Sequence, residues 1–248
     1  MKKAIPADVL RHLSFALVGG FFGAHAILGP GGIFGNAQTV NLLETLFSAI
    51  RGDFVSLGLH LAALAFYVVG VMAAVLLREK FHRDTARISP LLSAVCAFWL
   101  GLLPFGLHPA IYLYPIFLAM SFQWTAFTGA RGYVSSTIFS TNNVKQASIG
   151  LARYISDGQR RHLRRTGFFC LTLITFHVGA AIGALSVHIL PRFAAWLALP
   201  LIALSYAAVL REEHVSCSET ADAADRGEDS PPASCIPPVN IGDIEDCL

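Results

Sequence analysis

The sequence predicts an all-α integral membrane protein with six transmembrane helices in two inverted 3+3 repeats, each with a short re-entrant half helix. The chain is 54% hydrophobic and 14% charged, with a mean hydropathy of +0.58, against about 45–50% and about 25% in soluble domains. Several apolar runs are long enough to cross a bilayer. A polar segment of similar design interrupts these runs once in each half of the chain.

The apolar runs define the expected spans. The clearest is 55–77, which contains no charged residue. After a cytoplasmic amino terminus (1–12), the first repeat (13–107) is expected to span the membrane at about 13–28, 55–77 and 90–107. The second repeat (109–210) is expected to span it at about 109–129, 167–190 and 193–210. A small-x-small sequence at 24–26 also fits a cleaved signal peptide, but the place of the first run in the repeat favours a retained helix.

Glycines in two of these runs have the spacing of close-packed membrane helices. Gly19-x-x-x-Gly23 lies in the first run and Gly179-x-x-x-Gly183 in the fifth. Small residues four apart let two helix backbones approach closely. We therefore expect these two runs to lie at helix contacts.

The polar segments 33–53 and 135–157 resemble each other. Superposing them without gaps aligns Thr39 with Thr141 and Asn41 with Asn143. In both, Thr-x-Asn is followed by a short amphipathic run, which predicts half helices at 41–52 and 143–155. A dozen residues of helix reach only about 18 Å, well short of a hydrocarbon layer of about 30 Å. Each half helix is therefore expected to enter and leave by the same side.

The start of each half helix carries a capping pattern. Asn41 is followed three residues later by Glu44, and Asn143 by Gln146. At this spacing the N-cap side chain and the third helical residue satisfy each other's free backbone N–H groups. We expect both asparagines to be N-caps.

The placement of basic residues orients the spans. Lys and Arg are enriched on the cytoplasmic side of membranes. With both half helices re-entrant, all of the 18 Lys and Arg residues except Arg51 and Arg192 lie in cytoplasmic segments or in the half helix that opens to the cytoplasm. Each repeat then has three spans, so the second is inserted upside down, as in many secondary transporters. Both termini of this multi-pass protein are expected on the cytoplasmic side of the bacterial inner membrane.

The last segment, 211–248, is expected to be a disordered cytoplasmic tail. It contains ten Asp or Glu against two Lys or Arg and few aliphatic residues. Such a composition cannot bury enough apolar surface to offset the entropy of ordering.

A central polar site is the functional hypothesis. Two inverted half helices would direct their free N–H groups and positive dipole ends at the middle of the bilayer. This arrangement suits a small-solute permease or channel with a polar or anionic guest. The expected substrate-binding residues are polar side chains at that depth: Thr39, Asn41, Glu44, Gln123, Thr141, Asn143, Gln146 and His177.

The alternative is a non-transporting structural or regulatory membrane protein in which these groups only satisfy one another. A transporter should line a polar cavity with them, whereas a structural pair should pack them without a void.

Other functional classes have no support in the residues. The five cysteines have neither metal-type spacing nor a disulfide pattern, and no two histidines in the spans are spaced His-x3-His, so no metal or cofactor is expected. There is no Gly-rich phosphate loop, Ser/His/Asp set or paired carboxylates to indicate an enzyme. The basic cluster 160–165 lacks the interleaved aromatics of a nucleic-acid site. The expected partners are the lipid bilayer and a polar or anionic small solute.

Three short motifs are similar to those of the DUF1275 (YoaK-like) family of bacterial membrane proteins. The family carries Thr-Gly-Asn in each half and a pair ending in Gln at the start of the second half. The matching residues are Thr39-Val40-Asn41, Thr141-Asn142-Asn143 and Phe122-Gln123. The central Gly is replaced in both copies, and Gly23 stands where the family often has Asp. The resemblance covers roughly 13–210 and implies a six-helix membrane protein without indicating an activity.

Overall fold

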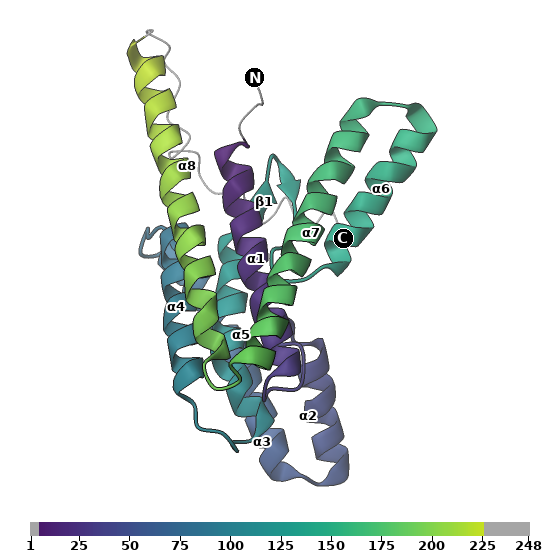
Figure 1. Cartoon of the computed structure of the whole chain (residues 1–248), viewed down its shortest axis with the longest axis vertical. Coiled ribbons are helices and arrows are strands. Elements are labelled where there is room, and N and C mark those ends of the chain that lie inside the picture. The colour runs from purple at the N-terminus through teal and green to yellow at the C-terminus, as the bar shows by residue number, and fades with distance from the viewer. Residues whose placement is uncertain (1–4, 226–248) are drawn as a thin grey trace.

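The computed structural model describes residues 5–225, with side chains described to residue 216. Within these residues the chain forms eight α-helices, one 3-10 helix and one two-stranded hairpin (Figure 1). The elements are α1 (Ala7–Leu28), α2 (Thr39–Arg51), α3 (Phe54–Glu79), α4 (Thr85–Leu102), α5 (Pro109–Ala126), β1 (Gly129–Ala130), β2 (Tyr133–Val134), α6 (Thr141–Asp157), α7 (Arg160–Ile189), η1 (Ala194–Ala198) and α8 (Leu199–Asp225). The expected helical fold class is confirmed.

Four helices in the described part of the chain are long and apolar enough to cross a membrane. They cover Phe54–Glu79, Thr85–Leu102, Arg160–Ile189 and Ala194–Ser216. Only 22% to 39% of the most apolar stretch of each is buried in the protein. Exposed apolar helices of this length require a lipid environment, so the chain is a membrane protein with several spans.

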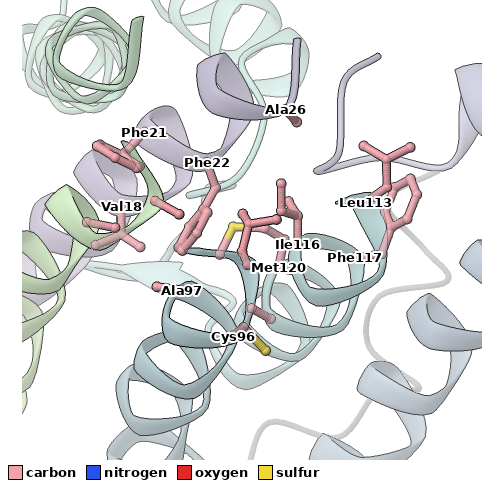
Figure 2. Packing of buried hydrophobic residues seen from close by; sticks show 14 of the residues in the cluster. Val18, Phe21, Phe22, Ala26, Cys96, Ala97, Leu113, Ile116, Phe117 and Met120 are labelled. Atoms are coloured by element: carbon pink, nitrogen blue, oxygen red, sulfur yellow. The ribbon is translucent and has the colours of Figure 1, made fainter. Parts of the chain in front are cut away.

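The other two expected spans, α1 and α5, form the centre of the molecule. Val18, Phe21 and Phe22 of α1 pack against Ile116, Phe117 and Met120 of α5 and against Cys96 and Ala97 of α4 (Figure 2). Because α1 and α5 face protein on most sides, they can carry Gly, His, Ser and Gln where a lipid-facing helix would be more uniformly apolar. Neither is among the four helices that are long and apolar enough to cross a membrane by length and composition alone.

Glycines set the closest helix contacts. A Cβ at Gly179 of α7 would lie 1.9 Å from the carbonyl oxygen of Leu17 of α1, and one at Gly183 would lie 2.5 Å from that of Phe21. Only glycine permits such an approach, so the second small-residue motif lies in the α1–α7 contact. The first small-residue motif, Gly19-x-x-x-Gly23, faces connecting segments instead, because Gly19 adjoins the carbonyl oxygen of Thr137.

The first four helices, α1 to α4, correspond in order to the last four, α5 to α8, and the two sets make the same contacts. α1 packs on α7 as α5 packs on α3, and α2 packs on α3 as α6 packs on α7. α4 packs on α5 as α8 packs on α1. In Figure 1, α2 and α6 lead away from the middle of the molecule toward opposite ends of its long axis. The two halves of the chain therefore share one set of helix contacts.

Some helices begin or end away from the expected spans. α7 begins at Arg160, so the cluster 160–165 forms its first turns. α4 ends at Leu102 rather than residue 107, because Leu103 precedes Pro104 and is extended.

The expected disorder from residue 211 is wrong as far as the structure describes the chain, since α8 continues to Asp225. Two ion pairs hold the first residues of this extension: Glu212 lies 2.6 Å from Arg11 of α1 and Glu213 lies 2.6 Å from Arg87 of α4. Local composition suggested disorder, but partners on other helices stabilise the helical form. The rest of the expected tail, 226–248, lies outside the described residues.

Candidate functional site

Asn41 joins α2 to α3. It is the third residue of α2 and is fully buried. Its Nδ2 donates to the carbonyl oxygen of His60 at 3.0 Å and to Oε1 of Gln38 at 2.9 Å. Its Oδ1 lies 2.9 Å from Nδ1 of His60. Because an amide oxygen only accepts, His60 carries its proton on Nδ1.

Asn143 occupies the equivalent place in α6 and is also buried. Its Nδ2 donates to the carbonyl oxygen of Ser136 at 2.6 Å, while its Oδ1 accepts from the Ser135 hydroxyl at 3.0 Å and the Ser136 N–H at 3.2 Å. Nε2 of His12 lies 2.9 Å from the same hydroxyl. Since Ser135 gives its hydrogen to Asn143, His12 donates from Nε2. A chain of hydrogen bonds therefore joins α1 to α6.

The expected N-cap role of both asparagines is wrong. α2 begins at Thr39 and α6 at Thr141, two residues before each asparagine. No side chain caps either helix start. The same amide that could have capped a helix instead bonds groups on other segments, where burial makes an unpaired polar group costly.

Glu44 and Gln146 consequently do not complete capping boxes. Glu44 lies 3.4 Å from Arg51 on α2, and its side chain is 35% exposed. Gln146 accepts a hydrogen bond from Arg165 at the start of α7. Both side chains are half-buried.

The remaining predicted residues are separated from the asparagines. Thr39 and Thr141 are exposed. His177 is exposed on α7, and its Nδ1 lies 2.7 Å from the carbonyl oxygen of Leu173 one turn earlier. The structure therefore brings together only part of the predicted set.

Gln123 lies at a second polar centre, where two connecting segments cross α1. It is fully buried, and its Nε2 donates to the carbonyl oxygen of Phe15 at 3.1 Å and to Oγ1 of Thr137 at 2.9 Å. Asn36, equally buried, donates from Nδ2 to the carbonyl oxygens of Gly19 and Ile138, both at 2.7 Å. We call this group the loop crossing; its residues are Asn36, Gln123, Thr137 and Ile138.

The amide oxygens of the loop crossing have a distinctive state. Each amide donates both of its hydrogens. Rotating either amide so that its oxygen and nitrogen exchange places would therefore lose two hydrogen bonds. Among the described residues, Oδ1 of Asn36 and Oε1 of Gln123 are buried without a hydrogen-bond partner, as are some polar atoms elsewhere, such as Oγ of Ser89 and of Ser93. Buried acceptors of this kind are rare in native proteins. Each of the two oxygens is therefore a free hydrogen-bond acceptor.

Sequence reasoning missed His12, Asn36 and Ser135. Asn36 could have been marked, because it ends a Gly-rich stretch between two helices and is polar in an apolar setting. His12 could not have been linked to Ser135, because 123 residues separate them.

Two surface pockets lie away from these polar centres. One, of about 340 Å³, is lined by residues 101–105 together with Arg192, Phe193 and Trp196. The other, of about 300 Å³, is lined by Arg153, Ser156, Asp157, Arg161 and His162 at the end of the α6–α7 hairpin. None of the predicted site residues lines either pocket.

The region that contains both polar centres corresponds to a known family model. The model for DUF1275, described as a protein of unknown function, matches residues 12–209, from the first turns of α1 into α8. No curated protein and no solved structure matches the chain. The motifs around Asn41, Gln123 and Asn143 lie within the matched region. The chain belongs to the DUF1275 family.

Proposed function

We propose that this protein is a small-solute permease or channel of the bacterial cytoplasmic membrane, with its solute site at the loop crossing. The proposal includes six membrane crossings, α1, α3, α4, α5, α7 and the η1–α8 segment, arranged as inverted repeats over 13–107 and 109–210. The helix contacts that repeat between the two halves support it. Inverted repeats with irregular segments meeting near the midplane are a common transporter architecture.

The charge distribution supports cytoplasmic termini. Ion pairs join Arg11 to Glu212 and Arg87 to Glu213. The starts of α1 and α4 therefore lie beside residues 212–213 of α8, at one end of the molecule. The basic start of α7 lies toward the same end (Figure 1). Arg51 is the last residue of α2, which points toward the opposite end (Figure 1), and Arg192 follows the far end of α7. The bias of Lys and Arg places the first end in the cytoplasm.

The two unpartnered amide oxygens are the observation that carries the proposal. Leaving a buried acceptor unsatisfied costs about 1–3 kcal/mol, and the crossing holds two such atoms beside the central helix α1. A solute with N–H or O–H donors, or a small cation, would satisfy them. We therefore favour a polar donor over an anion as the guest.

A thermal-shift screen followed by flux measurements tests the proposal. The purified protein is screened against ions and small polar metabolites, and each stabilising compound is tested for flux in proteoliposomes. Gln123→Met should abolish both responses because it removes the amide. The control is Thr125→Val on the same helix, which loses only a bond to Ser121 within α5. Absence of any stabilising solute, or equal losses in the two variants, would reject the site.

A second candidate, a non-transporting structural or regulatory membrane protein, is favoured by the two asparagines. The amides of Asn41 and Asn143 are bonded at both their oxygen and their nitrogen. Such groups hold α2 and α6 in place without needing a ligand. Under this candidate, polar variants change stability and leave every solute response absent.

A further inference from the structure

The free end of the α6–α7 hairpin forms a basic pocket. Arg153 and Ser156 of α6 and Arg161 of α7 line it, together with the pair Asp157 and His162. Over residues 141–165 the chain carries six Lys or Arg residues and a single carboxylate, Asp157. The pocket therefore lies in the most positively charged part of the described molecule.

Within the described residues, Asp157 forms its short contacts with groups other than the two guanidinium groups. Its Oδ1 accepts from the Gln159 N–H at 2.9 Å, and its Oδ2 lies 3.0 Å from Nε2 of His162. The bond from Gln159 lowers the pKa of Asp157 most, and His162 and the charge of Arg161 lower it further. Within the described residues, neither Arg153 nor Arg161 forms an ion pair. Nε of Arg161 donates to Nε2 of His162 at 3.4 Å, which leaves the terminal N–H groups of Arg161 and the Arg153 guanidinium available to an anion.

The α2–α3 hairpin shows that the turn itself does not require arginines. Gly52 and Gly158, with φ of 71° and 67°, end α2 and α6 in the same left-handed conformation. The residues that begin the next helix are exposed Phe54 and Val55 in the first hairpin, but Arg160 and Arg161 in the second. In the first hairpin Arg51 is paired with Glu44. The guanidinium pocket is therefore a feature of one half, added to a turn that forms without it.

The same hairpin also exposes apolar side chains. Leu151 and Ile155 of α6 and Leu163 of α7 are 46%, 77% and 45% exposed. A surface that combines arginines with exposed leucine and isoleucine is suited to the boundary between acyl chains and anionic headgroups. A freely soluble phosphate compound has no acyl chain to contact these apolar side chains.

We propose that the α6–α7 pocket binds the phosphate group of an anionic phospholipid. Arg153 and Arg161 approach from different helices, so one phosphate between them can accept hydrogen bonds from both forks. The Ser156 hydroxyl supplies a further donor. The bound lipid links α6 to α7 at the membrane surface, independently of any solute transport.

Native mass spectrometry of the full chain in detergent tests the lipid site. The protein is titrated with phosphatidylglycerol, with phosphatidylcholine as the zwitterionic comparison. The double variant Arg153→Gln/Arg161→Gln is compared with Arg160→Gln/Arg164→Gln, which removes the same charge from residues outside the pocket lining. We expect the pocket variant to bind phosphatidylglycerol about tenfold more weakly than the control. Equal affinities of the two variants would overturn the proposal, because the attraction would then be general.

Two further arms test the ligand class and the geometry. Glycerol phosphate is added as the headgroup alone; if it displaces the lipid at equal concentration, a soluble phosphate compound is the ligand and the lipid assignment fails. Arg153→Lys/Arg161→Lys keeps the charge but lacks the planar fork. Binding by this variant should lie between wild type and the Gln variant, whereas full wild-type binding would contradict the bidentate contact. Circular dichroism of each variant verifies folding, as expected for exposed positions.

Discussion

Asn143→Ala distinguishes a helix cap from a tertiary hydrogen-bond centre by the size of its effect. Removing an N-cap costs about 0.5–2 kcal/mol. In the structure the Asn143 side chain instead bonds the Ser136 N–H, the Ser136 carbonyl oxygen and the Ser135 hydroxyl. Ser135 and Ser136 are buried, so the backbone groups have little access to water.

The expected loss follows from these three groups. Each buried group left unpaired costs about 1–3 kcal/mol, and local relaxation with entry of water reduces the sum. We therefore expect Asn143→Ala to lower the free energy of unfolding by about 3–5 kcal/mol, more than a lost cap. The loss also interrupts the chain from His12, so the start of α6 should separate from residues 135–136 before the core unfolds.

Equilibrium unfolding in mixed detergent micelles measures this loss. Asn142→Ala is the control, because Asn142 is the neighbouring residue of α6 and is only half-buried. Hydrogen exchange of α6 reports the local detachment. A loss of less than about 2 kcal/mol for Asn143→Ala, or one equal to that of Asn142→Ala, would refute the tertiary role and restore the cap.

Three other predictions test the topology, the helix contacts and the hairpin turn. Reporter fusions at residues 82, 162 and 225 should report the cytoplasm and those at 53 and 108 the outside; an external signal at 82 would contradict the inverted repeat. Gly179→Leu should destabilise the protein by about 3 kcal/mol in the same unfolding assay because a Cβ there meets the Leu17 carbonyl oxygen at 1.9 Å, whereas Gly167→Leu, with nothing within 4 Å of the added Cβ, should not. The lowered pKa of Asp157 means that its charged form stabilises the fold above its ordinary pKa of 3.8. The stability lost in Asp157→Asn should therefore shrink as the pH falls below 3.8. A stability difference that persists in acid would show that the charge is irrelevant.

The two candidate functions make different demands on the polar centres. A structural pair requires only that Asn41 and Asn143 bond their neighbours, as they do. A permease also requires polar atoms that are unpaired and can bind a ligand, and the amide oxygens of Asn36 and Gln123 are unpaired. The solute screen and the asparagine variants therefore examine different residues, and their results can be interpreted separately.

The sequence by itself determined the helical membrane class. Lipid offers no hydrogen bonds to the backbone, so long apolar runs must be helices whatever surrounds them, and α3 and α7 appear where such runs occur. The Gly179 and Gly183 spacing was also informative, because close helix contact depends on local side-chain size. The resemblance of the polar segments pointed to Asn41 and Asn143 as important positions.

Only the tertiary structure decided what those asparagines bond. An asparagine near a helix start can serve as a cap or as a tertiary partner, and local spacing cannot distinguish the two. The answer depends on groups far along the chain: His12 reaches Ser135 across 123 residues, and Asn36 reaches Ile138 across 102. The extension of α8 was decided in the same way, since an acidic segment becomes helical where Arg11 and Arg87 meet its carboxylates. Helix formation in lipid follows from the local chain, whereas hydrogen bonds and ion pairs between helices depend on the packing that brings their partners together.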